Sequence, residues 1–361
     1  MGNARFLYNN LVTDESMITV SSLRTGVVTD AKKEGAGAAI ITTSGNYTGS
    51  LDKEYIIEID SVAVGAEIGQ ATFRWSNGGG SWNASGVATS SVSILLEAGV
   101  YIKWTAGTGD DFVIADKWYL KGINLWNANA MIDLDRDHRY RSAALESPNT
   151  IVIDLGSAQT FDSLVIYDHN LTNAAAITLE ADAAATFDSN GGSPQVSESV
   201  TWNADKILHY LAASATKQHA RLKITDAENP DGYIEIGELF LSSYLELTKN
   251  YIEGYSKGFE FIYDQQVNKF GVPRNRFYNK QRKFSYKFGV IQPVDVASLE
   301  DFLDSITDRA TGQLKPFFYN DDSTYPSEKT WMVDIYGMPE DHQVRDYYNV
   351  PLEFTERMTS I

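Results

Sequence analysis

The chain contains no cysteine among its 361 residues. This absence excludes disulfide bonds, thiolate metal sites and cysteine nucleophiles. Histidine is also scarce, with five residues and no pair at the i and i+4 spacing of a helical metal site. Each domain must therefore be held together by packing, and the length predicts two or three domains.

Basic side chains are few: 30 Lys and Arg face 48 Asp and Glu, a formal net charge of −18. Phosphate binding needs clustered basic side chains, so we expect no nucleic-acid partner. No uninterrupted apolar run approaches the length of a bilayer span, so we expect no membrane insertion. The first residues, MGNARFLYNN, have neither the basic nor the apolar region of a secretory signal.

The motifs of common enzymes are missing as well. GxSxG, the Walker loop, the dinucleotide fingerprint and HExxH do not occur. We therefore expect no enzymatic activity, no catalytic residue and no cofactor. Glycoside hydrolysis stays open as a less favoured alternative, because it needs only two carboxylates at the right separation.

The stretch from Asn149 to Thr172 has the strongest β pattern. Alternating apolar residues at 151–155 and a second apolar run at 164–167 predict two short strands joined by a turn. Asp168, His169 and Asn170 follow directly and predict a polar loop at one end of a β-sandwich, where such folds bind ligands. Further along, 221–225 and 233–241 read as a hairpin around Asn229-Pro230-Asp231-Gly232.

Residues 40–120 show short strands separated by glycine-rich turns, the pattern of an antiparallel sandwich. Four of the seven tryptophans lie here: Trp75, Trp82, Trp104 and Trp118. Most strand aromatics pack in cores. Trp82 stands beside a flexible Asn-Gly-Gly-Gly turn, and its ring is also a candidate platform for a sugar.

The densest charge lies in residues 122–142. Asp133, Asp135 and Asp137 alternate like the start of an EF-hand loop, whose oxygens suit Ca²⁺. The match fails at His138, where glycine is needed, and at Ala144, where glutamate is needed. We therefore predict no metal site and expect these carboxylates to pair with the neighbouring arginines at 136, 139 and 141.

From about Leu245 the pattern changes. Residues 283–290 alternate strictly, and 293–306 predict an amphipathic helix with Val296, Leu299, Phe302, Leu303 and Ile306 on its apolar side. Strands follow after Gly312. A sheet packed on one helix predicts an α+β domain.

The quoted segments resemble known families. NTIVIDLGSAQTFDSLVIYDHNLT and RLKITDAENPDGYIEIGELFL look like the galactose-binding-like (discoidin, F5/8 type C) sandwich of tailed-phage tail proteins. In that family a segment like NNLVTDESMITVSS is soon followed by one like NLWNANAMIDLDRDHRYRS, whereas here about a hundred residues separate them. The resemblance therefore implies an inserted sandwich, itself similar to small β-domains of phage tail and fibre proteins.

The end of the chain, through RKFSYKFGV and GQLKPFFYNDD, resembles distal-tail or baseplate modules. We thus expect a mainly β, multidomain chain with three parts. Residues 1–27 and 122–244 form a split galactose-binding-like sandwich, 28–121 an inserted sandwich, and 245–361 a C-terminal α+β domain.

The resemblance implies a structural component of a bacteriophage tail tip or baseplate. Its partners would be other tail or baseplate proteins and further copies of itself, in a trimeric or hexameric ring built through the C-terminal domain. Its location would be the virion, and the host cytoplasm during assembly.

The alternative function is binding of a host surface glycan. An aromatic face with Arg and Asp hydrogen bonds would hold a sugar at the loop end of the first sandwich. The candidate residues are Trp126, Asp135, Arg139, Arg141, His169 and Asn170, together with Trp82 on the inserted sandwich. For several of them a structural role is the favoured reading, with Trp126 in the core and Arg139 and Arg141 in ion pairs with the aspartates.

Overall fold

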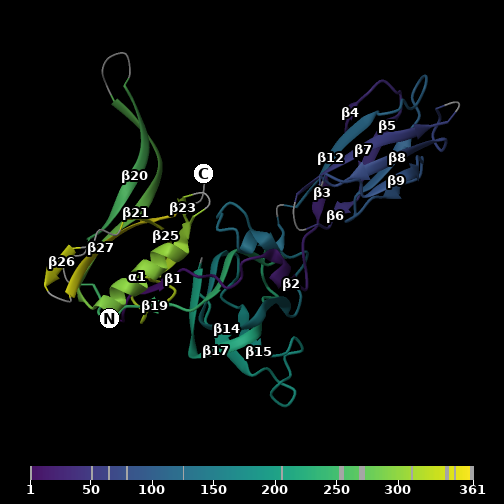
Figure 1. Cartoon of the computed structure of the whole chain (residues 1–361). Helices are drawn as coiled ribbons and strands as arrows, with labels where there is room; N and C mark the ends of the chain where they lie inside the picture. Colours follow the sequence, from purple (N-terminus) through teal and green to yellow (C-terminus); the bar gives the residue numbers. More distant parts are fainter. Residues whose placement is uncertain are drawn as a thin grey trace. The chain divides into compact units, whose positions relative to one another are not determined.

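The computed structural model describes residues 2–49, 52–63, 66–78, 80–124, 126–204, 206–251, 256–267, 273–309, 312–337, 341–344 and 347–357. It confirms a mainly β, multidomain chain with a single α-helix among these residues (Figure 1). The chain divides into two compact units. The first contains residues 1–21, 131–139 and 145–361, and the second contains 22–130 and 140–144.

The second unit is a β-sandwich of two antiparallel sheets. One sheet has the order β6-β3-β12-β7-β8-β9, with β4 also pairing with β12, and the other has the order β10-β11-β5. Its strands are β3 (Gly26–Val28), β4 (Lys32–Glu34), β5 (Ile40–Ser44), β6 (Asn46–Tyr47), β7 (Lys53–Val62), β8 (Ala71–Ser76), β9 (Ala84–Ala88), β10 (Ile94–Leu95), β11 (Tyr101–Thr105) and β12 (Lys117–Ile123). The short β13 (Tyr140–Arg141) also belongs to this unit.

Strict alternation builds the core of this sandwich. In β7, Tyr55, Ile57 and Ile59 point inward and are fully buried. They meet Trp104 of β11 and Trp118 of β12, whose ring centroids lie 6.4 Å apart at an interplanar angle of 84°. Trp75, Trp104 and Trp118 are therefore core residues, as expected, whereas 39% of Trp82 is exposed.

In the first unit, one sheet has the order β18-β14-β17-β15-β16, with β2 also pairing with β14. The strands are β2 (Ile18–Val20), β14 (Asn149–His169), β15 (Ala176–Asp182), β16 (Val196–Val200), β17 (Lys206–Thr225) and β18 (Glu235–Ser242). Two short 3-10 helices also occur, η1 (Glu15–Met17) and η2 (Ala128–Met131).

Two predictions for this sheet are wrong. Residues 151–155 and 164–167 belong to one bent strand, β14, because the chain passes Gly156 (φ +72°) in a bulge and continues along the same neighbour, β17. Residues 221–225 and 233–241 do not form the predicted hairpin, because β14 lies between β17 and β18. The Asn-Pro-Asp-Gly turn therefore lies in the connection from β17 to β18, two strands that are separated by β14. The residues of a turn do not by themselves distinguish such a connection from a hairpin.

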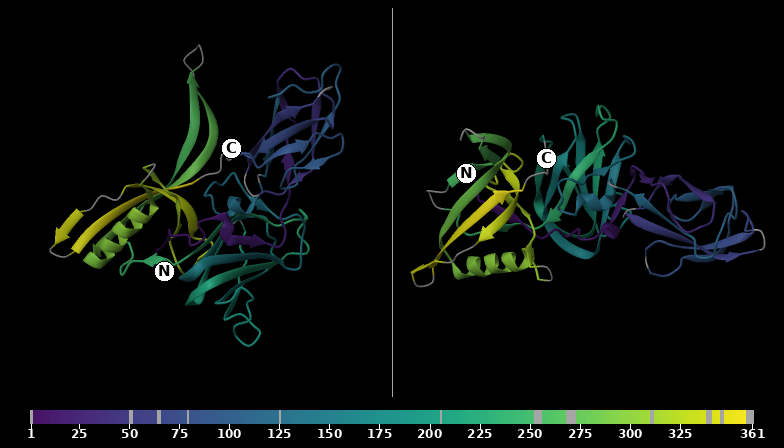
Figure 2. Two further views of the ribbon diagram at one scale, coloured as in Figure 1. Left: turned by 45° about the vertical axis from the view of Figure 1, so that its right-hand side comes forward. Right: turned by 90° about the horizontal axis from the view of Figure 1, so that it is seen from above.

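The C-terminal sheet has the order β19-β1-β24-β25-β27-β21-β20, and β26 also pairs with β27. Its strands are β1 (Arg5–Leu7), β19 (Leu245–Glu246), β20 (Ser256–Val267), β21 (Pro273–Ile291), β24 (Phe317–Asn320), β25 (Thr330–Gly337), β26 (Asp341–Val344) and β27 (Tyr347–Glu356). The helix α1 (Pro293–Ile306) and the small pair β22 (Thr307–Asp308) and β23 (Gln313–Leu314) complete this part. Figure 2 shows α1 lying along the sheet.

The helix is confirmed at its predicted bounds and with its predicted apolar side. Val296, Leu299, Phe302 and Ile306 are buried against the sheet. Asp295 accepts hydrogen bonds from the backbone N–H and hydroxyl of Thr248, and so ties the first turn to the segment that follows β19. An acidic residue in the first turn also suits the helix dipole.

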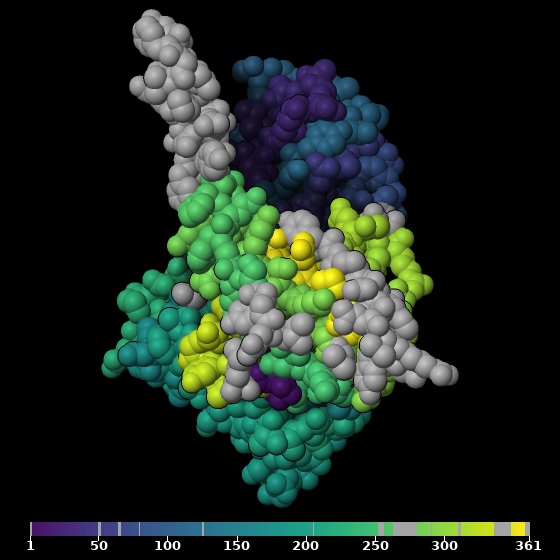
Figure 3. All heavy atoms as spheres, turned by 90° about the vertical axis from the view of Figure 1, so that its left-hand side faces the viewer, coloured from purple at the N-terminus to yellow at the C-terminus, as the bar shows by residue number. Residues whose placement is uncertain are grey.

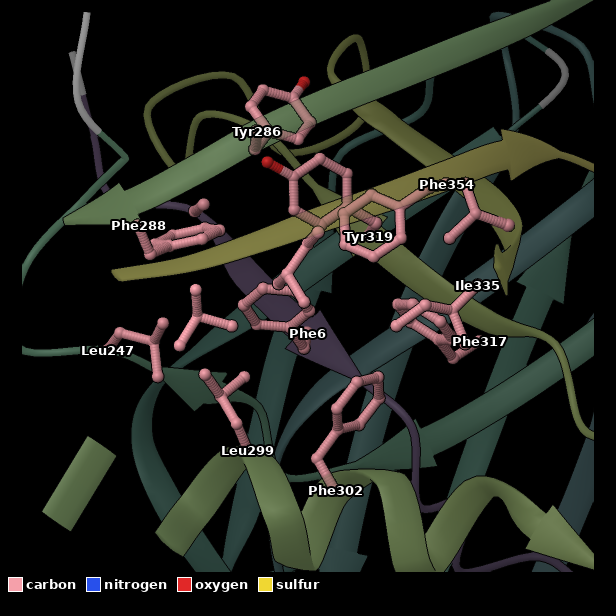
Figure 4. Close-up of a cluster of buried hydrophobic side chains, with 14 of the residues drawn as sticks. Phe6, Leu247, Tyr286, Phe288, Leu299, Phe302, Phe317, Tyr319, Ile335 and Phe354 are labelled. Carbon is pink, nitrogen blue, oxygen red and sulfur yellow. The ribbon is translucent and has the colours of Figure 1, made fainter. Parts of the chain in front are cut away.

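The N-terminal strand departs from its predicted place in the first sandwich. Arg5, Phe6 and Leu7 pair with β24 on one side, and Arg5 and Phe6 pair with β19 on the other. The ring of Phe6 is fully buried and lies between 5.4 and 6.4 Å from the rings of its five aromatic neighbours (Figure 4), which are Phe288, Phe302, Phe317, Tyr319 and Phe354. The start of the chain thus completes the C-terminal core.

A second cluster joins the bent sheet to the C-terminal sheet within the first unit. Val165, Tyr167 and Phe240 pack against Leu7, Phe318 and Met332. This contact explains the unbroken apolar run at 164–167, since both faces of β14 are covered there. The division into three domains stays a prediction.

Replacing Phe6 by alanine tests this reading of the core. Because the ring is fully buried, we expect Phe6→Ala to lower the free energy of unfolding of the first unit by about 3–5 kcal/mol. Denaturant unfolding followed by the fluorescence of Trp331, which lies in the same core, measures this. Val92→Ala, at a residue that is 72% exposed, should change it by less than about 0.5 kcal/mol; equal effects would refute the assignment.

Candidate functional site

Side chains in and around the predicted polar loop at the end of β14 form ion pairs and hydrogen bonds with each other and with neighbouring backbone. The guanidinium of Arg136 donates from Nε and Nη2 to the two carboxylate oxygens of Asp168, at 2.6 and 2.9 Å. Arg139 pairs with Glu235 at 3.1 Å. The expected pairing of these arginines with Asp133, Asp135 and Asp137 is therefore wrong: their partners lie on neighbouring strands.

Asn170 and His169 hold the same loop together. The Asn170 amide donates to Asp231 and to the Tyr233 carbonyl, and its oxygen accepts from the Glu235 N–H. His169 Nδ1 accepts from the Leu171 N–H at 3.2 Å. These side chains fix backbone, which leaves them few groups to offer a sugar.

The aspartate run has local partners. Asp133 pairs with His138 Nδ1 at 2.8 Å and accepts from the Asp135 N–H, while Asp135 is about half exposed and accepts from the Asp137 N–H. Pairing with Asp133 raises the pKa of His138. Within the ranges given above, no group of three or more His, Asp or Glu side chains is arranged to hold a metal ion.

Trp126 and Arg141 belong to the second unit. Trp126 is partly buried between two guanidinium groups, whose central carbons lie 4.6 Å (Arg24) and 5.4 Å (Arg141) from its ring centroid. Stacked cations of this kind stabilise an aromatic ring by themselves. The ring is therefore engaged within the protein.

Trp82 is placed differently, in a groove of about 280 Å³ on the larger sheet of the second unit. Strands β8 and β12 flank β7 and supply the floor and one wall, and the turn before Trp82 supplies the other. The lining residues are Ile56, Ser76, Gly78, Gly80, Ser81, Trp82, Lys117 and Tyr119. The groove therefore combines two aromatic rings, two hydroxymethyl groups and one ammonium group.

The sequence holds the turn of this groove in shape. Gly78 and Gly80 have φ values of +85° and +75°, which glycine adopts without strain. Asn83 closes the turn by accepting from the Asn77 N–H at 3.0 Å and by donating its own N–H to the Trp75 carbonyl. Trp82 is thus presented by a closed loop on a strand end.

Glu58 holds the two basic side chains beside the groove in place. Its two oxygens contact Arg74 at 2.7 Å and Lys117 at 3.3 Å, and the Arg74 guanidinium lies 4.2 Å from the Trp82 ring centroid. Tyr119 donates its hydroxyl to Glu34 at 3.1 Å. Lys117 and Tyr119 escaped the sequence analysis, although their alternation with the inward-facing Trp118 marks them as outward residues of the same strand.

Glu238 on β18 is a carboxyl group with a strongly raised pKa. Its side chain is fully buried, and neither carboxylate oxygen has a hydrogen-bond partner that satisfies normal geometry among the described residues. Burial, with a smaller contribution from the charges of Asp133 and Asp168, raises the pKa of Glu238 to about 9, although the Leu134 N–H and Arg357 act in the opposite direction. Glu238 is therefore neutral at pH 7, and without access to solvent it cannot serve a substrate.

No protein-family model matches the chain, and no curated protein matches it. Similar solved structures include a Ruminococcus gnavus GH29 fucosidase in complex with fucose (16% identity, TM-score 0.27), of which the match covers 23%. They also include chitosan-binding module 1 of a Paenibacillus chitosanase/glucanase (18%, 0.27, 88% covered) and a Streptococcus pneumoniae fucose-binding module (12%, 0.26, 89% covered). Each match covers 34% of this chain. At these TM-scores the likenesses carry no argument about function. Among the described residues, no helix is long and apolar enough to cross a membrane.

The buried carboxyl gives a pH test. Between pH 5 and 9 the unfolded chain has lost the Glu238 proton and the folded chain keeps it, so stability falls as pH rises. Glu238→Gln has no proton to lose, and its change in unfolding free energy from pH 5 to 9 should be smaller by at least about 2 kcal/mol. Denaturant titrations across this range measure it. The exposed Glu300→Gln should follow the wild-type profile. A Glu238→Gln profile parallel to that of the wild type would refute the assignment of a buried, protonated carboxyl at Glu238.

Proposed function

We propose that this protein binds glycan through the groove around Trp82. The observation that carries the proposal is a large aromatic ring, 39% exposed, that lines a concave surface together with hydroxyl and ammonium donors. Sugar rings present an apolar face of C–H groups and an edge of hydroxyls, so an aromatic platform with polar groups beside it is suited to them.

The mixed charge of the groove indicates the class of sugar. Glu58 pairs with both Arg74 and Lys117, so its single charge neutralises one of the two cations. Glu34 accepts a hydrogen bond from the Tyr119 hydroxyl. The one charged residue that lines the groove, Lys117, is therefore already paired with a carboxylate. This supports a neutral oligosaccharide as the ligand, held by stacking on Trp82 and by hydrogen bonds from Lys117 and the two serines.

The test is a glycan array followed by titration of the best-binding oligosaccharide. Trp82→Ala should weaken binding about tenfold or more, since a central aromatic anchor contributes over 1 kcal/mol. Tyr101→Ala is the matched control: Tyr101 is 37% exposed on the other sheet of the same sandwich and does not line the groove. Wild-type affinity in Trp82→Ala, or an array without any bound glycan, would overturn the proposal.

A second function, assembly through the C-terminal sheet, is supported by a separate observation. Within β21 only residues 283–291 pair with β27, whereas 273–282 pair with β20 alone. We call residues 257–267 and 273–282 the arm. Figure 1 shows these strands extending past the rest of their sheet, and in Figure 3 the arm residues drawn in green lie at the surface.

The arm carries large apolar side chains that are exposed in the single chain. Phe284, Tyr286 and Phe288 are buried on the core side of β21. Opposite Arg282 and Lys280, on the same side, stand Phe259 and Phe261, which are 52% and 58% exposed. The core side of the sheet thus continues beyond the core as an exposed surface with apolar rings, as an interaction surface does.

The other side of the same strands is also uncovered. A groove of about 490 Å³ lies along β20, β21 and β27, lined by Gly258, Lys283 and Ser285 among others. No described strand pairs with the outer edge of β20. Edges and faces of this kind favour association with another chain. The resemblance implies that this assembly is the tail tip or baseplate of a bacteriophage virion, and that identity stays a prediction.

Removing the exposed rings should abolish association. We expect Phe259→Ser with Phe261→Ser, the arm variant, to raise the concentration at which copies associate more than tenfold, measured by sedimentation velocity. Val92→Ser with Ile114→Ser removes two exposed apolar side chains, 72% and 63% exposed, from the second unit and should not change the concentration at which copies associate. Association by the arm variant at wild-type concentrations would contradict the proposal.

A further inference from the structure

Four charged side chains alternate in sign across the sheet that carries the groove. Glu34 on β4 lies opposite Lys117 on β12. Lys117 in turn lies opposite Glu58 on β7, and Glu58 lies opposite Arg74 on β8. Figure 1 labels these four strands side by side in the second unit. Because residues directly opposite each other on neighbouring strands share one face of a sheet, these four form a row on the face of the groove, which we call the charge row.

Arg74 supports the ring of Trp82. Its guanidinium carbon lies over one face of the indole, 4.2 Å from the ring centroid, which leaves the opposite face for a sugar ring. Glu58 holds the guanidinium there at 2.7 Å, since the buried Nε of Arg74 has no hydrogen-bond partner among the described residues. A cation over an aromatic face is attracted to it. This support keeps the orientation of a ring that stands on a turn built around Gly78 and Gly80.

Lys117 is the second cation, and it lines the groove itself. Its ammonium group lies 3.3 Å from Glu58 and its side chain is 38% exposed, so it remains accessible to a sugar hydroxyl. Each cation therefore has a task in binding: one presents the ring and the other donates to the ligand. Two positive charges beside a groove would by themselves attract carboxylate and sulfate groups.

The two carboxylates of the charge row remove this attraction. Glu58 is the more buried of them, with a side chain that is 10% exposed and one oxygen on each cation. Glu34 lies on the other side of Lys117 and accepts from the hydroxyl of Tyr119, which also lines the groove. Two acidic and two basic side chains leave the charge row without net formal charge.

Resting on the glycan-binding function of this groove, we propose that Glu58 is the specificity-determining residue that keeps acidic sugars out. It does so by balancing Arg74 and Lys117, the cations that binding requires. A sugar carboxylate or sulfate that enters the groove gives up water without meeting a net positive charge, which opposes its binding. A neutral sugar has no such loss. Specificity of this kind comes from an attraction that is withheld from the wrong ligand.

Replacing Glu58 by glutamine tests the proposal, because Glu58→Gln keeps the size of the side chain and removes its charge. The probes are neutral oligosaccharides and the same oligosaccharides carrying a uronic acid or a sulfate group, titrated at low salt. We expect the ratio of acidic to neutral affinity to rise at least about threefold, the effect of one unbalanced charge at a partly exposed site. The rise should shrink at high salt, since salt screens exposed charges.

Two further variants control for other causes. Glu67→Gln loses the same charge at an exposed residue of the same unit that does not line the groove, so its ratio should equal that of the wild type. Glu58→Gln with Lys117→Gln restores the balance of the charge row. Its ratio should return to the wild-type value, although its overall affinity falls. A purely structural role of Glu58 would not be reversed by removing a second side chain.

A folded Glu58→Gln with the wild-type ratio, or an equal rise in Glu67→Gln, would overturn the proposal. If the melting temperature shows that Glu58→Gln does not fold, Glu34→Gln decides, because it removes the other carboxylate of the charge row at an exposed residue. Its ratio should rise by a smaller factor, and an unchanged ratio there would contradict the proposal. A wild type that binds no glycan at all is a distinct result, since it refutes the glycan-binding function itself and this proposal with it.

Discussion

The packing of Phe6 among five aromatic rings is the contact on which the first unit depends. It places the N-terminal strand between β19 and β24, so the first and last thirds of the chain share one sheet. The same strand contributes Leu7 to the cluster that joins this sheet to β14 and β18. With no cysteine available, such clusters are what fixes the sheets to each other. The burial of Glu238 follows from this arrangement, because the face of β18 that carries it is covered.

In a chain whose sheets are joined by buried apolar clusters, binding is expected at the surfaces that leave large side chains exposed. The side chains predicted to bind sugar at the end of β14 are engaged with their own backbone and with one another. Trp82 and the arm are different, since each presents aromatic rings that are partly exposed: 39% for Trp82, 52% for Phe259 and 58% for Phe261. One surface is a groove of small-ligand size and the other an extended strand pair. They suit two kinds of partner, a sugar and a protein chain.

Local patterns predicted some elements well and long-range pairing poorly. The helix was found at its bounds because its apolar spacing and its proline start are local signals. The strand alternation at 283–290 and the buried tryptophans followed from the same reasoning. The bend of β14, the place of β1 and the separation of β17 from β18 depend on which strands pair, and no local pattern contains that information. Trp82 could be singled out by its turn, but Lys117 and Tyr119 reach the groove only through the pairing of β12 with β7.

Amide hydrogen exchange across a concentration series tests most directly the claim that the chain associates through the arm. Where the chain associates, the account predicts slower exchange in 257–262 and 280–285 than in dilute samples. Exchange in β14 and β17 should not change. Exchange in the arm that stays the same at every concentration would contradict the account.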